Sequence, residues 1–131
     1  YLEIGNIYAE RDWGHAQDYM DAIYLMMQHK FPDDFVVATG KKYSVKQLVE
    51  YVCKKLDYDI VWKINKKNNN FLAYDKSSNK IIIKSNNKHF RKAEVDSLLG
   101  NTSKIKKILK WEPKIKFYKM LDQMIDFDLK N

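Results

Sequence analysis

The sequence predicts an α/β fold in which helices alternate with a few short strands. Two observations lead to this prediction. Apolar residues recur at helical spacing in several segments, whereas other segments are short apolar runs that end at turn residues. A chain of 131 residues with 45% hydrophobic residues is also long and apolar enough to bury a core, so we treat residues 1–131 as one portion of structure.

The first half of the chain predicts two helices with a strand between them. The first helix is expected at residues 15–29, with one buried face. Its apolar stripe consists of Ala16, Tyr19, Met20, Ile23, Met26 and Met27. Ser44 and Gln47 have the spacing of a capping box, so a second helix begins at Ser44. Between the helices, the apolar run 35–38 ends at Gly40 and predicts a strand covered on both faces.

The remaining predicted elements are shorter. They are extended pieces at 2–4 and 11–13, a strand at 60–62 and a hairpin of 71–74 with 81–84. A short helix capped by Asn101, Thr102 or Ser103 and ending at about Leu109 follows, and a last helix is expected at 117–129. The last helix is expected to bury Met120, Leu121, Met124, Ile125 and Leu129. Residues 63–70 are nearly all Lys and Asn, which indicates a surface loop.

Positive charge is concentrated in part of the chain. The net charge is +7, and residues 63–92 carry 9 positive and 1 negative side chains. Such a surface is compatible with a small nucleic-acid-binding module, which stays as an alternative. However, the chain has 22 Lys and only 2 Arg, whereas proteins that read bases and phosphates rely on Arg. We therefore favour a solvated surface and expect no nucleic-acid partner.

The composition also bears on the compartment. Cys53 is the only cysteine, so no internal disulfide can form. No apolar run approaches the length of a membrane span, and no basic and apolar leader opens the chain. These features favour the cytoplasm and no membrane partner. Because the chain lacks an initiating Met, we interpret it as an excerpt of a longer protein. Its three histidines share no short ligand spacing, so no metal site is predicted.

The two arginines are the candidate anion-binding residues. Arg11 precedes a predicted helix N-terminus, where anions are readily held. Arg91 offers a planar fork for phosphate oxygens, and Glu94, three residues later, can accept hydrogen bonds from ribose hydroxyls. The alternatives are a surface ion pair of Arg91 with Glu94 and a salt bridge from Arg11 to Asp12 or Asp18.

Four segments carry a family resemblance. They are residues 11–19 (RDWGHAQDY), 32–40 (PDDFVVATG), 90–96 (FRKAEVD) and 109–114 (LKWEPK). In this order they resemble the C-terminal half of GDP-mannose 4,6-dehydratases, members of the extended short-chain dehydrogenase/reductase superfamily. The third segment is similar to the family's Arg-Pro-x-Glu-Val-Asp motif, although Lys92 stands in place of the proline. The match covers nearly the whole chain apart from residues 63–70.

The resemblance implies a function for the candidate residues. Arg11 and Arg91 would contact the diphosphate of GDP-mannose, and Glu94 its ribose. The full-length enzyme would bind NADP in an N-terminal Rossmann part, form a homodimer or homotetramer, and convert GDP-mannose to GDP-4-dehydro-6-deoxy-mannose. The four glycines of the chain form no Gly-x-Gly-x-x-Gly loop, and the family's catalytic residues lie upstream of the matched segments. We therefore expect a C-terminal substrate-binding portion that is inactive alone. Other dehydratases, epimerases and reductases of the superfamily stay as alternatives.

Overall fold

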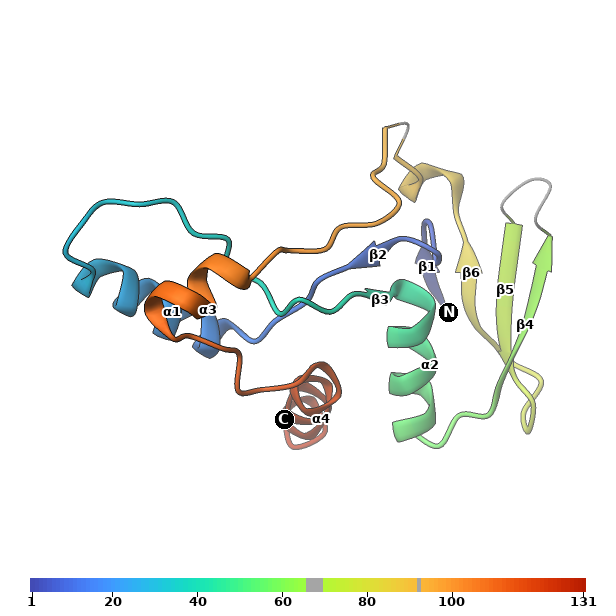
Figure 1. Ribbon diagram of the computed structural model, residues 1–131. Coiled ribbons are helices and arrows are strands. Elements are labelled where there is room, and N and C mark those ends of the chain that lie inside the picture. The colour runs from blue at the N-terminus through green and yellow to red at the C-terminus, as the bar shows by residue number, and fades with distance from the viewer. Residues whose placement is uncertain (66–69, 92) are drawn as a thin grey trace. The chain divides into compact units, whose positions relative to one another are not determined.

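The computed structural model describes residues 1–65, 70–91 and 93–131, which form two compact units (Figure 1). The first unit comprises Tyr1–Glu10 and Ser44–Asp96, and the second comprises Arg11–Tyr43 and Ser97–Asn131. Each unit has its own hydrophobic core. The α/β class predicted from the sequence is confirmed.

The first unit is built on a mixed four-stranded sheet. Its strands are β1 (Leu2–Ile4), β4 (Ile60–Asn65), β5 (Asn70–Asp75) and β6 (Ile81–Ser85), in the order β1-β6-β5-β4. β1 is parallel to β6, whereas β5 is antiparallel to both of its neighbours. The predicted β5–β6 hairpin is therefore confirmed. The chain after β6 continues into a short 3-10 helix, η1 (Asn87–His89).

Helix α2 (Val45–Lys55) covers one face of this sheet (Figure 1). The predicted capping box is present: Ser44 Oγ accepts the N–H of Gln47 at 3.1 Å, and Gln47 Oε1 accepts the N–H of Ser44 at 2.8 Å. These bonds satisfy backbone groups that a helix start leaves without partners. The core between helix and sheet consists of Ile7, Val49, Cys53, Phe71, Ala73 and Ile83.

The second unit is mainly helical. Its helices are α1 (Ala16–Gln28), α3 (Ser103–Leu109) and α4 (Phe117–Asp128), each within one residue of its prediction at either end. Ala22, Ile105 and Trp111 form the buried core. Two very short strands, β2 (Glu10–Arg11) and β3 (Tyr43–Ser44), lie where the chain passes from one unit to the other and pair as a separate two-stranded sheet.

The strand predicted at residues 35–38 is wrong. Among the described residues no strand pairs with this segment, which carries no secondary structure. The apolar run did indicate burial at Ala38, but Val36 is 52% exposed. A strand needs a hydrogen-bonded neighbour as well as apolar side chains, and only the apolar side chains are visible in sequence.

Two boundaries also differ from prediction. The surface loop expected at 63–70 is wrong at both ends, because β4 extends to Asn65 and β5 begins at Asn70; the intervening residues 66–69 lie outside the described part of the chain. Of the extended piece expected at 11–13, only Arg11 belongs to a strand. In both cases strand pairing set the boundary, rather than composition.

The expected burial of the two helical stripes is wrong in part. On α1 the fully buried residues are Asp18 and Ala22, whereas Met20 and Met27 are exposed. On α4, Leu121 is buried as predicted. Met124 and Leu129, from the same predicted stripe, are exposed.

Candidate functional site

The segment that leads to Arg91 is anchored by Asn86. The N–H of Asn86 donates to the carbonyl of Ile4 at 3.1 Å, and its side-chain oxygen caps η1 by accepting the N–H of Lys88 at 2.9 Å. Gly5 permits this approach, because a Cβ added there would lie 2.3 Å from the carbonyl oxygen of His89. The backbone entering residues 90–96 is therefore held against the end of β1 by direct hydrogen bonds.

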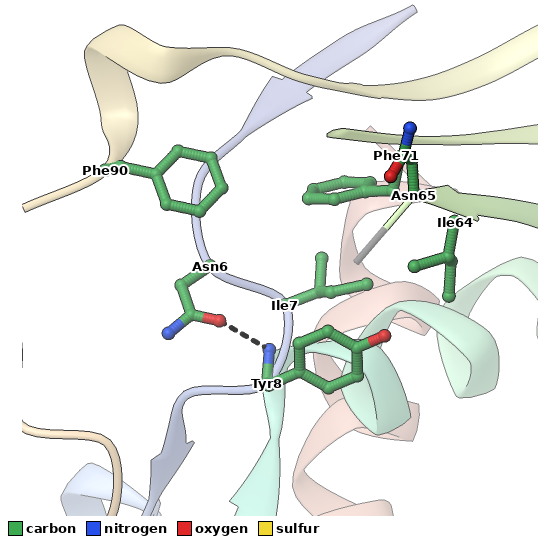
Figure 2. Close-up of a pocket in the computed structure, with 7 residues that line it drawn as sticks. All are labelled: Asn6, Ile7, Tyr8, Ile64, Asn65, Phe71 and Phe90. Carbon is green, nitrogen blue, oxygen red and sulfur yellow. Dashed lines mark hydrogen bonds between the residues drawn. The ribbon is translucent and has the colours of Figure 1, made fainter. Parts of the chain in front are cut away.

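Phe90 provides a second anchor. Its ring packs against the core of the first unit and lines a pocket of about 320 Å³ (Figure 2). The lining residues are Asn6, Ile7, Tyr8, Ile64, Asn65, Phe71 and Phe90. The walls are mostly aromatic and aliphatic, and Asn6 Oδ1 is already used by the N–H of Tyr8 at 2.9 Å (Figure 2). The pocket is therefore an apolar surface formed in part by Phe90, the residue before Arg91.

Arg91 itself is exposed, and among the described residues it makes no hydrogen bond or ion pair. The surface ion pair with Glu94, weighed from the sequence, is therefore not formed. Glu94 is half-buried and is engaged by other groups of the protein. An exposed guanidinium on an anchored backbone is suited to bind an external anion, because its planar fork matches phosphate oxygens.

Arg11 is half-buried in β2. The next residue, Asp12, accepts four hydrogen bonds through its carboxylate. Asp12 Oδ1 accepts the N–H of Thr39 at 2.8 Å and its hydroxyl at 2.6 Å. Asp12 Oδ2 accepts the N–H groups of Gly40 at 2.9 Å and Gly100 at 3.3 Å. These bonds give Asp12 a role other than the salt bridge to Arg11 considered from the sequence.

Asp18 is also committed within the second unit. Its side chain is 2% exposed, and Oδ2 accepts the N–H of Ile115 at 2.8 Å. The indole N–H of Trp111 donates to the backbone carbonyl of Asp18 at 3.1 Å. Sequence reasoning placed Asp18 at the helix start but missed this link, because no local spacing signals a partner 97 residues away.

The start of α1 is further ordered by Tyr19 and His15. Burial raises the pKa of Tyr19, and the charges of Asp12 and Asp18 add to the effect, so its hydroxyl stays protonated. Gly14 lies close to this ring, since an added Cβ would approach the Tyr19 hydroxyl to 2.4 Å. His15 Nδ1 accepts the N–H of Gln17 at 3.2 Å and caps the helix. The helix start is therefore a packed corner with its own cap.

The three predicted site residues are divided between the units. Arg91 and Glu94 belong to one segment of the first unit, whereas Arg11 is the first residue of the second. Within the first unit, the N–H of Glu10 donates to the carbonyl of Asp96 at 2.8 Å, which places the residue before Arg11 beside the end of the 90–96 segment. The convergence of Arg11 and Arg91 on one ligand stays a prediction.

Three other features bear on function: metal-binding groups, membrane-spanning helices and the single cysteine. Within 1–65, 70–91 and 93–131, no group of three or more His, Cys, Asp or Glu side chains could hold a metal ion. In the same residues, no helix is long and apolar enough to cross a membrane. Burial raises the pKa of the Cys53 thiol, with a further contribution from the charge of Glu50, so this cysteine is a weak nucleophile.

Comparison with known sequences supports the family resemblance of the four motifs. A family model described as GDP-mannose 4,6 dehydratase matches residues 1–124. A GDP-mannose 4,6 dehydratase from Dictyostelium discoideum is 41% identical over 128 residues, and one from Drosophila melanogaster is 38% identical over 129. Each alignment covers 98% of this chain but only 35% and 32% of the relative. The chain therefore spans about a third of the length of these relatives.

Comparison with solved structures concerns the fold. The structure of RMD from Pseudomonas aeruginosa complexed with NADPH matches with a TM-score of 0.67 and 18% identity, over 95% of this chain and 34% of that one. At this identity the likeness shows a shared fold alone.

Proposed function

The chain belongs to the GDP-mannose 4,6 dehydratase family, and from that premise we propose that it is the substrate-binding portion of an enzyme that converts GDP-mannose to GDP-4-dehydro-6-deoxy-mannose. The reaction oxidises C4 of the sugar, eliminates water across C5 and C6, and returns the hydride to C6. The portion supplies contacts to the nucleotide part of the substrate and none to the reacting carbons. It is the C-terminal part of the full-length enzyme and is inactive alone.

The observation that carries the proposal is the state of Arg91. Its guanidinium is exposed and has no hydrogen bond or ion pair among the described residues, while Asn86 and Phe90 fix the backbone on its N-terminal side. Arg91 binds the substrate diphosphate through paired N–H donors. Arg11 adds a second cation to the diphosphate, and Glu94 accepts hydrogen bonds from the ribose.

NADP is the cofactor of the proposed enzyme, and the residues of this chain do not fit its binding loop. The four glycines are Gly5, Gly14, Gly40 and Gly100, and no two of them are close enough in sequence to form a glycine-rich turn around a pyrophosphate. When bound, NADP supplies the redox chemistry, because its oxidised form accepts a hydride and its reduced form donates one. Its contacts are assigned to a Rossmann part outside residues 1–131.

The proposal extends to assembly and location. The full-length enzyme forms a homodimer or homotetramer in the cytoplasm. Another nucleotide-sugar dehydratase, epimerase or reductase of the same superfamily would use the same two arginines. A substrate panel separates them: the proposed enzyme turns over GDP-mannose and leaves UDP-glucose and dTDP-glucose unchanged.

The test is the Arg91→Ala variant of the full-length enzyme. Loss of one charge-assisted diphosphate contact is expected to raise KM for GDP-mannose by about tenfold or more, with a smaller change in kcat. Arg91→Lys keeps the charge but loses the fork, so it should recover only part of the affinity. Steady-state kinetics across a GDP-mannose titration give both values.

Lys88→Ala is the matched control, since it removes an exposed cation three residues away in η1. Its KM should equal that of the wild type. An equal rise in KM for Lys88→Ala and Arg91→Ala would point to general electrostatic attraction and contradict a specific diphosphate contact.

A further inference from the structure

The carboxylate of Asp12 is saturated by donors from distant parts of the second unit. Its four hydrogen bonds come from Thr39, Gly40 and Gly100, at sequence separations of 27, 28 and 88 residues. Bonds from N–H and O–H groups to an ionised carboxylate are stronger than those between neutral groups. Asp12 therefore connects three chain segments at one point.

The backbone that carries these donors has features that favour its conformation near Asp12. Gly40 has a φ of +72°, a conformation that glycine adopts more readily than other residues. At Gly100, an added Cβ would lie 2.1 Å from the Cβ of Ala38. The Thr39 hydroxyl also accepts the N–H of Lys41 at 3.2 Å, which closes the turn. Gly40 is therefore favoured by its backbone conformation, whereas Gly100 is favoured because a side chain there would clash with Ala38.

With all four donors in place, Asp12 is fully committed to the protein. It is therefore poorly placed to bind substrate or transfer a proton. What it does fix is the backbone directly after Arg11. On the far side of Asp12, Trp13 stacks on Phe117 with ring centroids 5.6 Å apart and planes 14° apart. The strand residue Arg11 is thus followed by two consecutive anchored positions.

We propose that Asp12 is a positioning residue for substrate binding: its carboxylate, held by Thr39, Gly40 and Gly100, sets the backbone from which Arg11 reaches the anion. This inference rests on the proposed function of Arg11. Asp12 would then affect the affinity for the substrate only through the position of Arg11. An isosteric amide cannot replace the carboxylate, because the NH₂ of Asn would face a backbone N–H with no lone pair to offer.

A double-mutant cycle in the full-length enzyme tests the proposal. Asp12→Asn is expected to raise KM for GDP-mannose by about tenfold, with kcat within about twofold of the wild type. Arg11→Ala should raise KM by a similar factor. In the Arg11→Ala background, Asp12→Asn should have no further effect on KM, because the group that it positions is gone.

Each deviation from this pattern has a meaning. Equal effects of Asp12→Asn with and without Arg11 would overturn the positioning role and leave the proposed function intact. A wild-type KM for Arg11→Ala would overturn both the positioning role of Asp12 and the diphosphate contact proposed for Arg11, whereas the proposed function is tested separately by Arg91→Ala. A parallel fall in kcat and melting temperature, without the KM change, would mean that Asp12 only stabilises the fold and would also overturn the proposal.

A milder variant keeps the test usable if Asp12→Asn does not fold. Thr39→Val removes the hydroxyl that donates to Asp12 and that bonds to Lys41 within the turn, and it keeps the three backbone N–H donors to Asp12. KM should therefore rise by about threefold, and again only when Arg11 is present. Asp33→Asn is the control, since Asp33 is an exposed carboxylate of the same unit that pairs with Lys104. Its KM should match the wild type. A wild-type KM for Thr39→Val, or an equal rise in the Arg11→Ala background, would count against the proposal.

Discussion

The interior of each unit is stabilised by a different kind of interaction. In the first, α2 lays its apolar face on a four-stranded sheet, and the core is formed by aliphatic and aromatic side chains. In the second, Asp12 and Asp18 accept backbone N–H groups from segments 27 to 97 residues away, around a smaller core. Carboxylates therefore link distant segments of the second unit, whereas the buried carboxylate of the first unit, Asp75, bonds mainly to Ser77 and Ser78 in the adjacent turn.

The helices show the same contrast. Both α1 and α2 are amphipathic, yet α2 buries Val49 and Cys53 whereas α1 buries Asp18 and Ala22 and leaves Met27 76% exposed. An apolar stripe indicates that a helix has a face suited to burial. Whether that face is buried depends on which partner is present, and in the second unit the buried core around Ala22 is formed with Ile105 and Trp111.

The largest expected effect comes from the apolar core. Phe71 is 5% exposed, and Phe71→Ala should destabilise the first unit by about 3–5 kcal/mol, because it removes a large buried ring and leaves a cavity. Hydrogen exchange of the full-length protein should show faster exchange in β4, β5 and β6 than in α1. Phe127→Ala, at a position 67% exposed, is the control and should change stability little. Equal acceleration in α1 would show that the two units unfold together and remove the distinction.

A smaller effect is expected from the polar link. Asp18→Ala leaves the N–H of Ile115 without its acceptor, which should cost about 2 kcal/mol. Exchange should accelerate in α1 and near residue 115 while the sheet stays protected. Asp21→Ala removes an exposed ion pair to Lys114 and should cost well under about 1 kcal/mol. If Asp18→Ala were as mild as this control, carboxylates would not be what holds the second unit.

The smallest effect concerns Asp75, a buried carboxylate at the end of β5 in the first unit. The Ser77 and Ser78 hydroxyls and the backbone N–H of Ser78 lower its pKa, and the N–H of Asp59 contributes less. A carboxylate whose pKa is lowered on folding stabilises the protein above its unfolded pKa of about 4, and this stabilisation is lost as the pH falls through the folded value.

Asp75→Asn should accordingly destabilise the protein at pH 7 and differ progressively less from the wild type as the pH falls below about 4. Denaturant unfolding at a series of pH values measures the difference. A constant gap across this range would exclude ionisation as its cause. The result would sharpen the comparison, because Asp75 orders the turn between β5 and β6 and is not part of the apolar core of its unit.

Much of the fold was predictable because its signals are local. Helix limits followed from capping residues and apolar spacing, and the capping box at Ser44 and Gln47 formed as expected. The hairpin was visible from two apolar runs around a polar turn. Among the site residues, Arg91 is exposed, and its contact with the diphosphate stays a prediction.

The residues 11–19 themselves place a cation and two carboxylates near a helix start, and with the three later motifs they carry the family resemblance. Only the tertiary structure decided what each carboxylate does. Apart from the Thr39 hydroxyl, the partners of Asp12 and Asp18 are backbone N–H groups, which every residue except proline carries and no sequence pattern marks. The tertiary structure likewise decided that residues 35–38 form no strand, since a ladder depends on a neighbour that comes from elsewhere in the chain. Interactions between neighbouring residues can be predicted from the sequence, whereas the pairing of distant segments is visible only in the folded chain.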